Sequence, residues 1–470
     1  MGKGRKSLYK NLFTIGYYSY SYTIIQFLAS MVISRLLTPM EYGIVAMITV
    51  FTGFISYFKD AGISYVIIRE DYGRQFHQKV QALTFLVGFL LFLIVALLSF
   101  PISVFYGRSE LFIPTIVVAF VLFIETVSIV PVALLKKNLQ FRQVGKTYFL
   151  GYVSGSIATI FFAYIGLSYW SLVFGQLLSV IIIYFKAQSY IHIYMGPFNK
   201  VAIISAWNKT KSVIYSISGS RFIQYWSSNA DNLIIGKWFG ASSLGLYSRA
   251  YQLLTMQLNL ISGIFNTILL PSLKEDKRKG NDVLERSYED ALSFMSLIIY
   301  PITFTLVLFP EELVTIIWGH DWRGVAKYAP YFGILSMTYI LSRTFGNIYV
   351  LYNKEQLLFK IGIFSATISL GAILLGAYFG IVEIAAFISF AFVAIILPFN
   401  IFIAFYKNFK FPANKLLLFW LPKIVISLVV ITGLFMNNKF IAEVGIYCLA
   451  LHVLIMGRSH ILKLIGFKRK

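Results

Sequence analysis

Residues 80–105 read VQALTFLVGFLLFLIVALLSFPISVF, and none of these side chains is charged. An α-helix rises 1.5 Å per residue, so about 20 consecutive apolar residues cross the roughly 30 Å hydrocarbon layer of a bilayer. A membrane β-barrel strand instead alternates apolar and polar residues over about ten positions. The stretch therefore predicts a transmembrane helix, whose backbone polar groups bond to one another inside the lipid.

Similar apolar runs recur along the whole chain. Of its 470 residues, 58% are hydrophobic and 13% are charged, whereas an average soluble domain has about 45–50% apolar and about 25% charged residues. We therefore expect an all-α integral membrane protein with about 14 transmembrane helices. The predicted spans are residues 11–34, 41–65, 80–105, 111–135, 147–166, 169–188, 212–236, 243–270, 287–309, 328–351, 357–379, 381–406, 416–435 and 440–457.

The basic residues are unevenly distributed between the predicted connections. The chain has 41 Lys+Arg and 19 Asp+Glu, for a net charge of +22. Of these 41 residues, 30 fall in the two tails and the even-numbered connections, if Lys186 and Lys360 at the adjoining span ends are included, and 6 fall in the odd-numbered connections. Lysine and arginine accumulate in the cytoplasmic loops of membrane proteins. The asymmetry predicts cytoplasmic termini, and it accounts for the positive charge without a nucleic-acid partner.

A short internal repeat relates the two halves of the chain. Residues 34–45 (SRLLTPMEYGIV) and 236–247 (GKWFGASSLGLY) align without gaps at an offset of 202. Each copy places a cation, Arg35 or Lys237, eight residues before a glycine. Six spans separate the copies, which indicates two lobes in the same orientation, as in transporters with parallel repeats. We expect an N-lobe of six helices at 1–190, a cytoplasmic linker at 191–210, a C-lobe of six helices at 211–410, and two C-terminal helices with a basic tail at 411–470.

Three arginines fall deep inside predicted spans, namely Arg221, Arg249 and Arg343. A charge inside a bilayer costs several kcal/mol, so such residues usually face a cavity or a partner. Guanidinium groups bind phosphate oxygens in a bidentate manner. These arginines therefore predict a hydrated cavity for an anionic substrate.

Acidic residues also occur inside the spans. Asp60, Glu125 and Asp231 are candidate counter-ions to the arginines or sites for a coupling ion. Lys59 directly precedes Asp60, and this pair at the end of a span is equally well explained by side chains that reach the interface.

Motifs for catalysis, nucleotide binding and metal binding are incomplete. Gly145-Lys146-Thr147 resembles the end of a P-loop, but Gln140 occupies the place of the upstream glycine. The single cysteine excludes an internal disulfide, and the five histidines lack the spacing of metal ligands. We therefore expect a protein that is not an enzyme, with no catalytic residue, metal or cofactor.

Four segments carry a resemblance to a known family. Residues 36–43 (LLTPMEYG), 59–63 (KDAGI), 231–236 (DNLIIG) and 244–251 (LGLYSRAY) resemble polysaccharide flippases. The resemblance is to the Wzx-type and teichuronic-acid-exporter branch of the multidrug/oligosaccharidyl-lipid/polysaccharide (MOP) superfamily. It extends from about residue 10 to residue 275, and beyond that only the hydropathy pattern agrees.

The resemblance implies alternating access between two six-helix bundles. Its implied substrate is an undecaprenyl-pyrophosphate-linked oligosaccharide, moved from the cytoplasmic to the outer leaflet of a bacterial inner membrane for surface polysaccharide biosynthesis. Arg35 and Arg249 lie in the matching segments and would bind the pyrophosphate, and Arg221 is given the same role because of its predicted depth in the membrane alone. Asp60 and Asp231 are candidates for coupling to an ion gradient or the membrane potential. Implied partners are bilayer lipids, a polysaccharide polymerase and chain-length regulators.

Three other functions remain open at this point. A membrane-embedded glycosyltransferase or polysaccharide polymerase would be polytopic and basic too, but it needs a large outer loop, and the predicted outer connections are short. A multidrug exporter of the same superfamily would share the fold, usually with 12 spans and an acidic site. A scaffold without transport activity would have no use for the deep charges.

Overall fold

The computed structural model describes the backbone of residues 3–464 except 61, 195 and 197–199. Contacts divide the chain into two compact units, residues 1–245 and 246–470. The predicted division into lobes, linker and C-terminal helices remains a prediction. For some of these residues the structure describes the backbone but not the side chain. They are residues 3–15, 19, 200–203, 205, 206, 208–224, 227, 259–268, 413, 415, 416 and 453–464.

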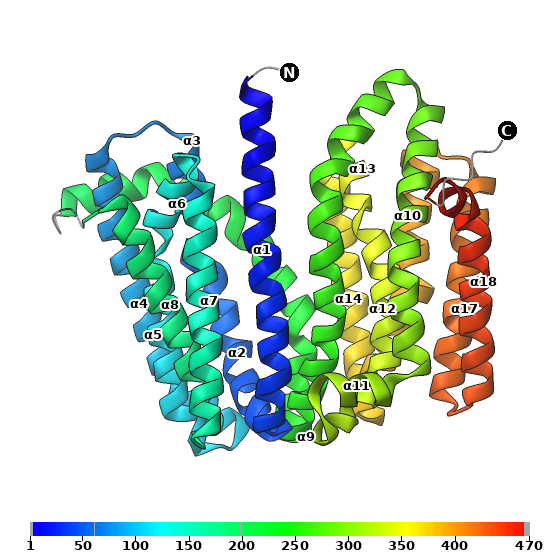
Figure 1. The fold of residues 1–470 in the computed structure, drawn as a ribbon, viewed down its shortest axis with the longest axis horizontal. Coiled ribbons are helices and arrows are strands. Elements are labelled where there is room, and N and C mark those ends of the chain that lie inside the picture. The colour runs from blue at the N-terminus through cyan, green and yellow to red at the C-terminus, as the bar shows by residue number, and fades with distance from the viewer. Residues whose placement is uncertain (1–2, 61, 195, 197–199, 465–470) are drawn as a thin grey trace. The chain divides into compact units, whose positions relative to one another are not determined.

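The first unit consists of helices joined by short connections (Figure 1). Its last helix, α9, continues into the second unit. In chain order the elements are α1 (Lys3–Leu36), α2 (Pro39–Asp60), α3 (Ile63–Arg69), α4 (Arg74–Tyr106), the short 3-10 helix η1 (Ser109–Leu111), α5 (Phe112–Val127), α6 (Ile129–Lys137), α7 (Phe141–Tyr164), α8 (Trp170–Ile191) and α9 (Lys200–Lys279).

The second unit is also built from helices, and no strand occurs among the residues that the structure describes. The predicted all-α class is therefore confirmed. The elements are α10 (Asn281–Leu308), α11 (Pro310–Trp318), the 3-10 helix η2 (His320–Lys327), α12 (Ala329–Arg343), α13 (Phe345–Leu351), α14 (Glu355–Phe379), α15 (Ile381–Ala391), the π-helical η3 (Phe392–Ile396), α16 (Leu397–Asn400), the π-helical η4 (Ile401–Asn408), α17 (Ala413–Phe435) and α18 (Lys439–Leu464).

Helices long and apolar enough to cross a membrane occur in both units. Within the described residues, 8 segments meet this condition, so the chain is a multi-pass membrane protein, and the number of 14 spans remains a prediction. These segments are Pro39–Arg69, Arg74–Tyr106, Ser109–Lys137, Trp170–Ile191, Asn281–Leu308, Glu355–Phe379, Ile381–Asn408 and Leu417–Phe435.

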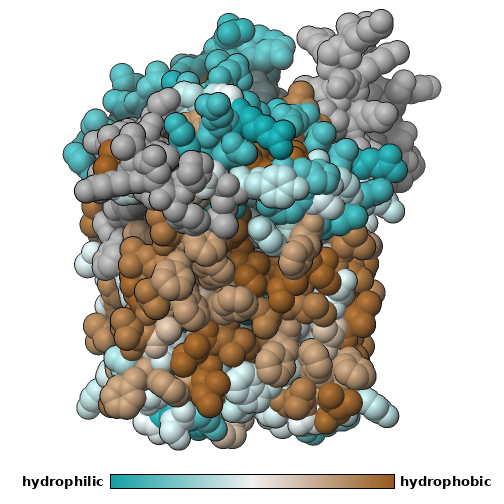
Figure 2. Space-filling view, turned by 90° about the vertical axis from the view of Figure 1, so that its left-hand side faces the viewer, coloured by the Kyte–Doolittle hydropathy of each residue, from teal (hydrophilic) through white to brown (hydrophobic). Residues whose placement is uncertain are grey.

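The surface of the first unit carries the apolar band that a bilayer requires. Figure 2 shows apolar side chains between a strongly hydrophilic surface above and a paler, mixed surface below. On α4, for example, Leu90, Leu97 and Phe100 are exposed. Such a continuous apolar surface would drive aggregation in water, whereas lipid tails cover it at no cost.

The break between α5 and α6 follows from Pro131. Proline has no backbone N–H, so the carbonyl of Val127, four residues earlier, loses its helical donor. Gln81 of α4 replaces that donor: its Nε2 donates to Val127 O at 3.0 Å in a buried setting. The predicted span 111–135 therefore consists of two helices that meet at Ser128, and the junction is fixed to α4.

Helix α9 contains two predicted spans with one break between them. Gly240 has φ 83° and ψ 178°, a conformation that favours glycine. The helix then continues to Lys279, nine residues beyond the end of the predicted span 243–270. Lys279 Nζ lies 3.2 Å from a carboxylate oxygen of Glu275, an i,i+4 pair that stabilises an exposed helix. The hydrogen bond to Glu275 raises the pKa of Lys279.

The two copies of the repeat pack against each other within the first unit. A Cβ on Gly43 would lie 1.7 Å from the backbone oxygen of Ala241, and a Cβ on Gly245 would lie 1.9 Å from that of Pro39. Position 241 corresponds to position 39 at the offset of 202, and 245 corresponds to 43. The contact is therefore reciprocal, as in a two-fold interface, where each partner contributes the same surface.

We predict that Gln81→Leu lowers the stability of the protein by about 1–3 kcal/mol, because Val127 O then loses a buried donor. Pro131→Ala restores a backbone N–H four residues after Val127. The double variant should therefore regain most of the loss. Thermal unfolding of the purified variants in detergent measures both effects, and an equal loss in the single and double variants would contradict the assignment.

Candidate functional site

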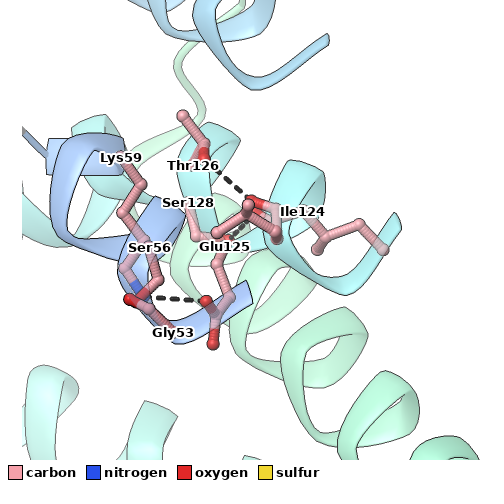
Figure 3. Close-up of polar contacts among 8 residues, drawn as sticks. Gly53, Ser56, Lys59, Ile124, Glu125, Thr126 and Ser128 are labelled. Atoms are coloured by element: carbon pink, nitrogen blue, oxygen red, sulfur yellow. Dashed lines mark hydrogen bonds and ion pairs between the residues drawn. The ribbon is translucent and has the colours of Figure 1, made fainter. Parts of the chain in front are cut away.

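An ion pair lies inside the first unit, between two membrane-spanning segments. Lys59 Nζ at the end of α2 donates to Glu125 Oε2 of α5 at 2.7 Å (Figure 3). The two side chains are 31% and 28% exposed, so each is partly shielded and still reachable. An unpaired charge here would be costly, and the pair neutralises both. Sequence reasoning considered Lys59 only with its neighbour Asp60, and it missed this partner.

Tyrosines from α1 and α7 lie close to the ion pair. The ring of Tyr22 is 5.0 Å from that of Tyr152, which stacks on Tyr148 at 6.0 Å. The charge of Glu125 acts on both Tyr148 and Tyr152. The interior of this unit therefore combines an ion pair with phenol rings, whose apolar faces and hydroxyl groups suit a substrate with both apolar and polar surfaces.

Asp60 stabilises the first turn of the neighbouring helix, α3. Its Oδ1 accepts a hydrogen bond from the backbone N–H of Ser64 at 2.9 Å, in the first turn of α3. The first N–H groups of a helix have no partner within the helix, so a carboxylate stabilises them. Asp231 is 4% exposed, and its Oδ1 accepts from the N–H of Asn232 at 2.8 Å. Glu125, the third predicted acidic candidate, is the partner of Lys59 in the ion pair.

The predicted arginines have different surroundings. Arg35 is exposed and its Nη1 donates to Met31 O at 2.7 Å. Arg343 is also exposed, and its guanidinium lies 5.4 Å from the centre of the Tyr339 ring. The side chain of Arg221 lies outside the described residues.

Arg249 is the buried member of the set, at 6% exposure. Its guanidinium carbon lies 5.6 Å from the ring centre of Trp318 and 5.3 Å from that of Trp322. Its Nη1 donates to Gln252 Oε1 at 2.5 Å. Two indole rings and an amide thus stabilise the charge away from water. Sequence reasoning identified the cation but not these rings, which come from α11 and η2, about 70 residues later.

The fold is that of known membrane transporters. The structure aligns with the lipid II flippase MurJ in an inward closed conformation at a TM-score of 0.71 and 15% identity, covering 96% of this chain and 99% of that one. It also aligns with an inward-facing MATE multidrug resistance transporter of the MOP superfamily, at a TM-score of 0.57 and 14% identity, covering 89% and 96%. The predicted transporter fold is confirmed.

Sequence comparison places the chain within this class. Residues 32–327 match the family described as polysaccharide biosynthesis protein. The teichuronic acid biosynthesis protein TuaB of Bacillus subtilis (strain 168) is 22% identical over 351 residues, which are 72% of this chain and 70% of that protein. The chain belongs to the polysaccharide biosynthesis protein family, so the resemblance to polysaccharide flippases of the MOP superfamily is confirmed.

We predict that Arg249→Ala lowers the melting temperature, because it removes the cation between the two indole rings and leaves a cavity; the cost is about 2 kcal/mol or more. Arg249→Met keeps a long side chain between the rings and should retain more stability. Thermal unfolding of the purified variants in detergent compares them. If Arg249→Ala has the wild-type melting temperature, the packing of the Trp318 and Trp322 rings does not depend on the side chain of Arg249.

Proposed function

We propose that the protein is a flippase that moves an undecaprenyl-pyrophosphate-linked oligosaccharide repeat unit from the cytoplasmic to the outer leaflet, for surface polysaccharide biosynthesis. The observation that carries the proposal is the combination of a polysaccharide biosynthesis family with the fold of a lipid II flippase over nearly the whole chain. The site residues of the first unit support it, because a diphosphate requires cations and an oligosaccharide requires rings and hydroxyl groups.

Lys59 is suited to receive the pyrophosphate. Before the substrate arrives, Glu125 neutralises the ammonium at 2.7 Å. A phosphate oxygen can replace the carboxylate, so that the ammonium of Lys59 stays paired throughout, and the partial exposure of Lys59 leaves room for the exchange. Four arginines remain proposed contacts for the pyrophosphate, because a guanidinium group can donate two parallel hydrogen bonds to phosphate oxygens. They are Arg35, Arg221, Arg249 and Arg343.

Release of Glu125 supplies a means of energy coupling. A carboxylate that loses its lysine inside the membrane is stabilised when it binds a proton or a metal cation. An ion gradient or the membrane potential would then favour one direction of transport, with Glu125 as the first candidate and with Asp60 and Asp231 as further ones. No reaction or cofactor enters this scheme.

Alternating access requires that the site opens to each side of the membrane in turn. The reciprocal packing of Gly43 on Ala241 and of Gly245 on Pro39 lies within the first unit, so it would keep the helices of that unit together during this motion.

The same proposal includes the membrane, the orientation and the partners of the protein. The charge asymmetry of 30 to 6 supports cytoplasmic termini in a bacterial inner membrane. The partners would be the lipid-linked oligosaccharide, bilayer lipids, and a polysaccharide polymerase with its chain-length regulators.

A second candidate is multidrug export, which the alignment with a MATE transporter favours. The two functions differ in the charge of the substrate. Drug export of cations would use Glu125 and be indifferent to Lys59, whereas the flippase requires the lysine.

We predict that a deletion strain accumulates intact oligosaccharide on undecaprenyl pyrophosphate, inaccessible to an external glycosidase. Complementation with the wild-type gene should remove the accumulated lipid. The control variant Lys360→Met, which changes an exposed lysine on α14, should do the same. Lys59→Met should not, because the pyrophosphate loses its cation. Lipid extraction and mass spectrometry measure the accumulated species.

The double variant Lys59→Met/Glu125→Met separates folding from transport, since apolar residues often replace a shielded ion pair without loss of stability. It should reach the membrane at the wild-type level and still fail to clear the lipid-linked sugar. Accumulation of single repeat units on the outer side would indicate a polymerase instead. No accumulation in the deletion strain would favour drug export.

A further inference from the structure

A cavity lies in the second unit, between the first turns of α10 and the start of α17. It contains about 330 Å³ of space between atoms, its opening to the outside included. Two carboxylates and four aromatic rings line it, and they belong to Glu285, Glu289, Tyr288, Phe411, Phe419 and Trp420. No lysine or arginine occurs among the lining residues that the structure describes. The cavity therefore offers hydrogen-bond acceptors and ring faces, which suit a cation.

The two carboxylates lie on one face of α10. Glu285 and Glu289 are four residues apart, so their side chains are neighbours on the helix, and like charges at this spacing repel each other. Glu285 is 7% exposed, and Glu289 is partly buried. A carboxylate has about four acceptor positions, so each can accept a hydrogen bond from a ligand in addition to any other bond. A cation that contacts both would remove their repulsion.

The rings differ in what they can offer a cation. Phe419 already has Lys423 Nζ at 3.4 Å from the centre of its ring. The ring of Phe411 is held by Phe405 at 5.2 Å, and that of Trp420 is held by Phe419 at 5.2 Å. These contacts fix both rings before a ligand arrives. The face of an aromatic ring attracts an ammonium within about 6 Å of its centre, so Phe411 and Trp420 are suited to such a group.

The cavity lies at the depth where lipid headgroups are found. The apolar segment Leu417–Phe435 begins six residues after Phe411. The predicted span 287–309 begins two residues after Glu285. Both lining segments thus stand where the chain enters the hydrocarbon layer, and the predicted orientation assigns this level to the cytoplasmic leaflet.

The surroundings of the cavity match the other parts of a phospholipid. Leu417, Leu418 and Leu421 of α17 are exposed, and they give acyl chains an apolar surface directly after the cavity. Lys410 is exposed and directly precedes Phe411, so its ammonium can bind a phosphate beside the cavity.

We propose that this cavity binds the ethanolamine headgroup of a phospholipid in the cytoplasmic leaflet. The primary ammonium of the lipid donates to Glu285 and Glu289 and lies against the rings of Phe411 and Trp420. Its phosphate contacts Lys410, and its acyl chains cover the exposed leucines of α17. The bound lipid stabilises the second unit. The site is separate from the ion pair of the first unit and does not depend on the proposed transport function.

The test is thermal unfolding of the full-length protein in detergent with added dioleoyl phosphatidylethanolamine. The wild-type melting temperature should rise and then saturate, because the lipid binds the folded state. Dioleoyl phosphatidylglycerol has the same acyl chains but no ammonium, so it should give a smaller rise. Equal rises with the two lipids would overturn the proposal.

Ethanolamine in solution distinguishes a lipid from a soluble amine. It supplies the same ammonium without the phosphate and the acyl chains, so it should give no saturable rise over the same concentration range. A saturating rise as large as that with the phospholipid would assign the cavity to a soluble amine and overturn the proposal of a lipid.

Substitution of the carboxylates tests the contact itself. Glu285→Gln and Glu289→Gln should each weaken the apparent affinity for phosphatidylethanolamine roughly tenfold, as expected for a lost hydrogen bond between charged groups. The matched control Asp282→Asn changes an exposed carboxylate of α10 outside the cavity and should behave as the wild type. An unchanged affinity in Glu289→Gln would contradict the proposal, and this result does not require Glu285→Gln to fold.

Discussion

The reciprocal contact between the two copies of the repeat is the constraint on which the first unit depends. Gly43 and Gly245 each lie against the backbone of the other copy, so a side chain at either position would occupy space already filled by a carbonyl group. The contact joins segments 202 residues apart in the chain. It therefore brings the middle of α9 into the same compact unit as α1 and α2.

Several contacts of α9 reinforce this arrangement. Lys237 donates to the carbonyl of Phe105 at the end of α4, and its Nζ lies 5.0 Å from the centre of the Phe105 ring. The hydroxyl of Tyr225 donates to Val50 O of α2. Gly240 then breaks the helix before the glycine contact. A segment predicted as part of the C-lobe thus supplies structural contacts to the helices of the N-lobe.

The membrane explains why the charges in this protein have such specific surroundings. Three cations that the structure describes are stabilised in different ways: Lys59 by a carboxylate, Arg249 by two indole rings and an amide, and Lys423 of α17 by the carbonyl and the ring of Phe419. In water these arrangements would contribute little. In a medium of low polarity they decide whether a helix can carry the charge at all. The ion pair differs from the other two because it is partly exposed, and we therefore assign it to transport.

The sequence predicts the features that depend on local composition. Apolar runs indicate helices, and the spacing of 202 identifies the repeat. The sequence does not predict contacts between distant elements, because nothing near Glu125 or Trp322 in the sequence indicates which residue each of them contacts. The break at Ser128 was predictable in principle from Pro131, whereas the compensating bond from Gln81 was not. The sequence indicates the acidic residue of the candidate site, but it suggests Asp60, the sequence neighbour of Lys59, and gives no sign of the contact between Lys59 and Glu125.

The most direct measurement of the central claim is flipping by the purified protein. It would be reconstituted into vesicles containing an undecaprenyl-pyrophosphate-linked oligosaccharide, and the glycosidase-accessible fraction would be followed over time. Our account predicts that oligosaccharide from the inner leaflet becomes accessible in vesicles with the protein and stays protected in empty vesicles. Equal protection in both, with a protein that remains folded, would contradict the assignment as a flippase for lipid-linked oligosaccharides.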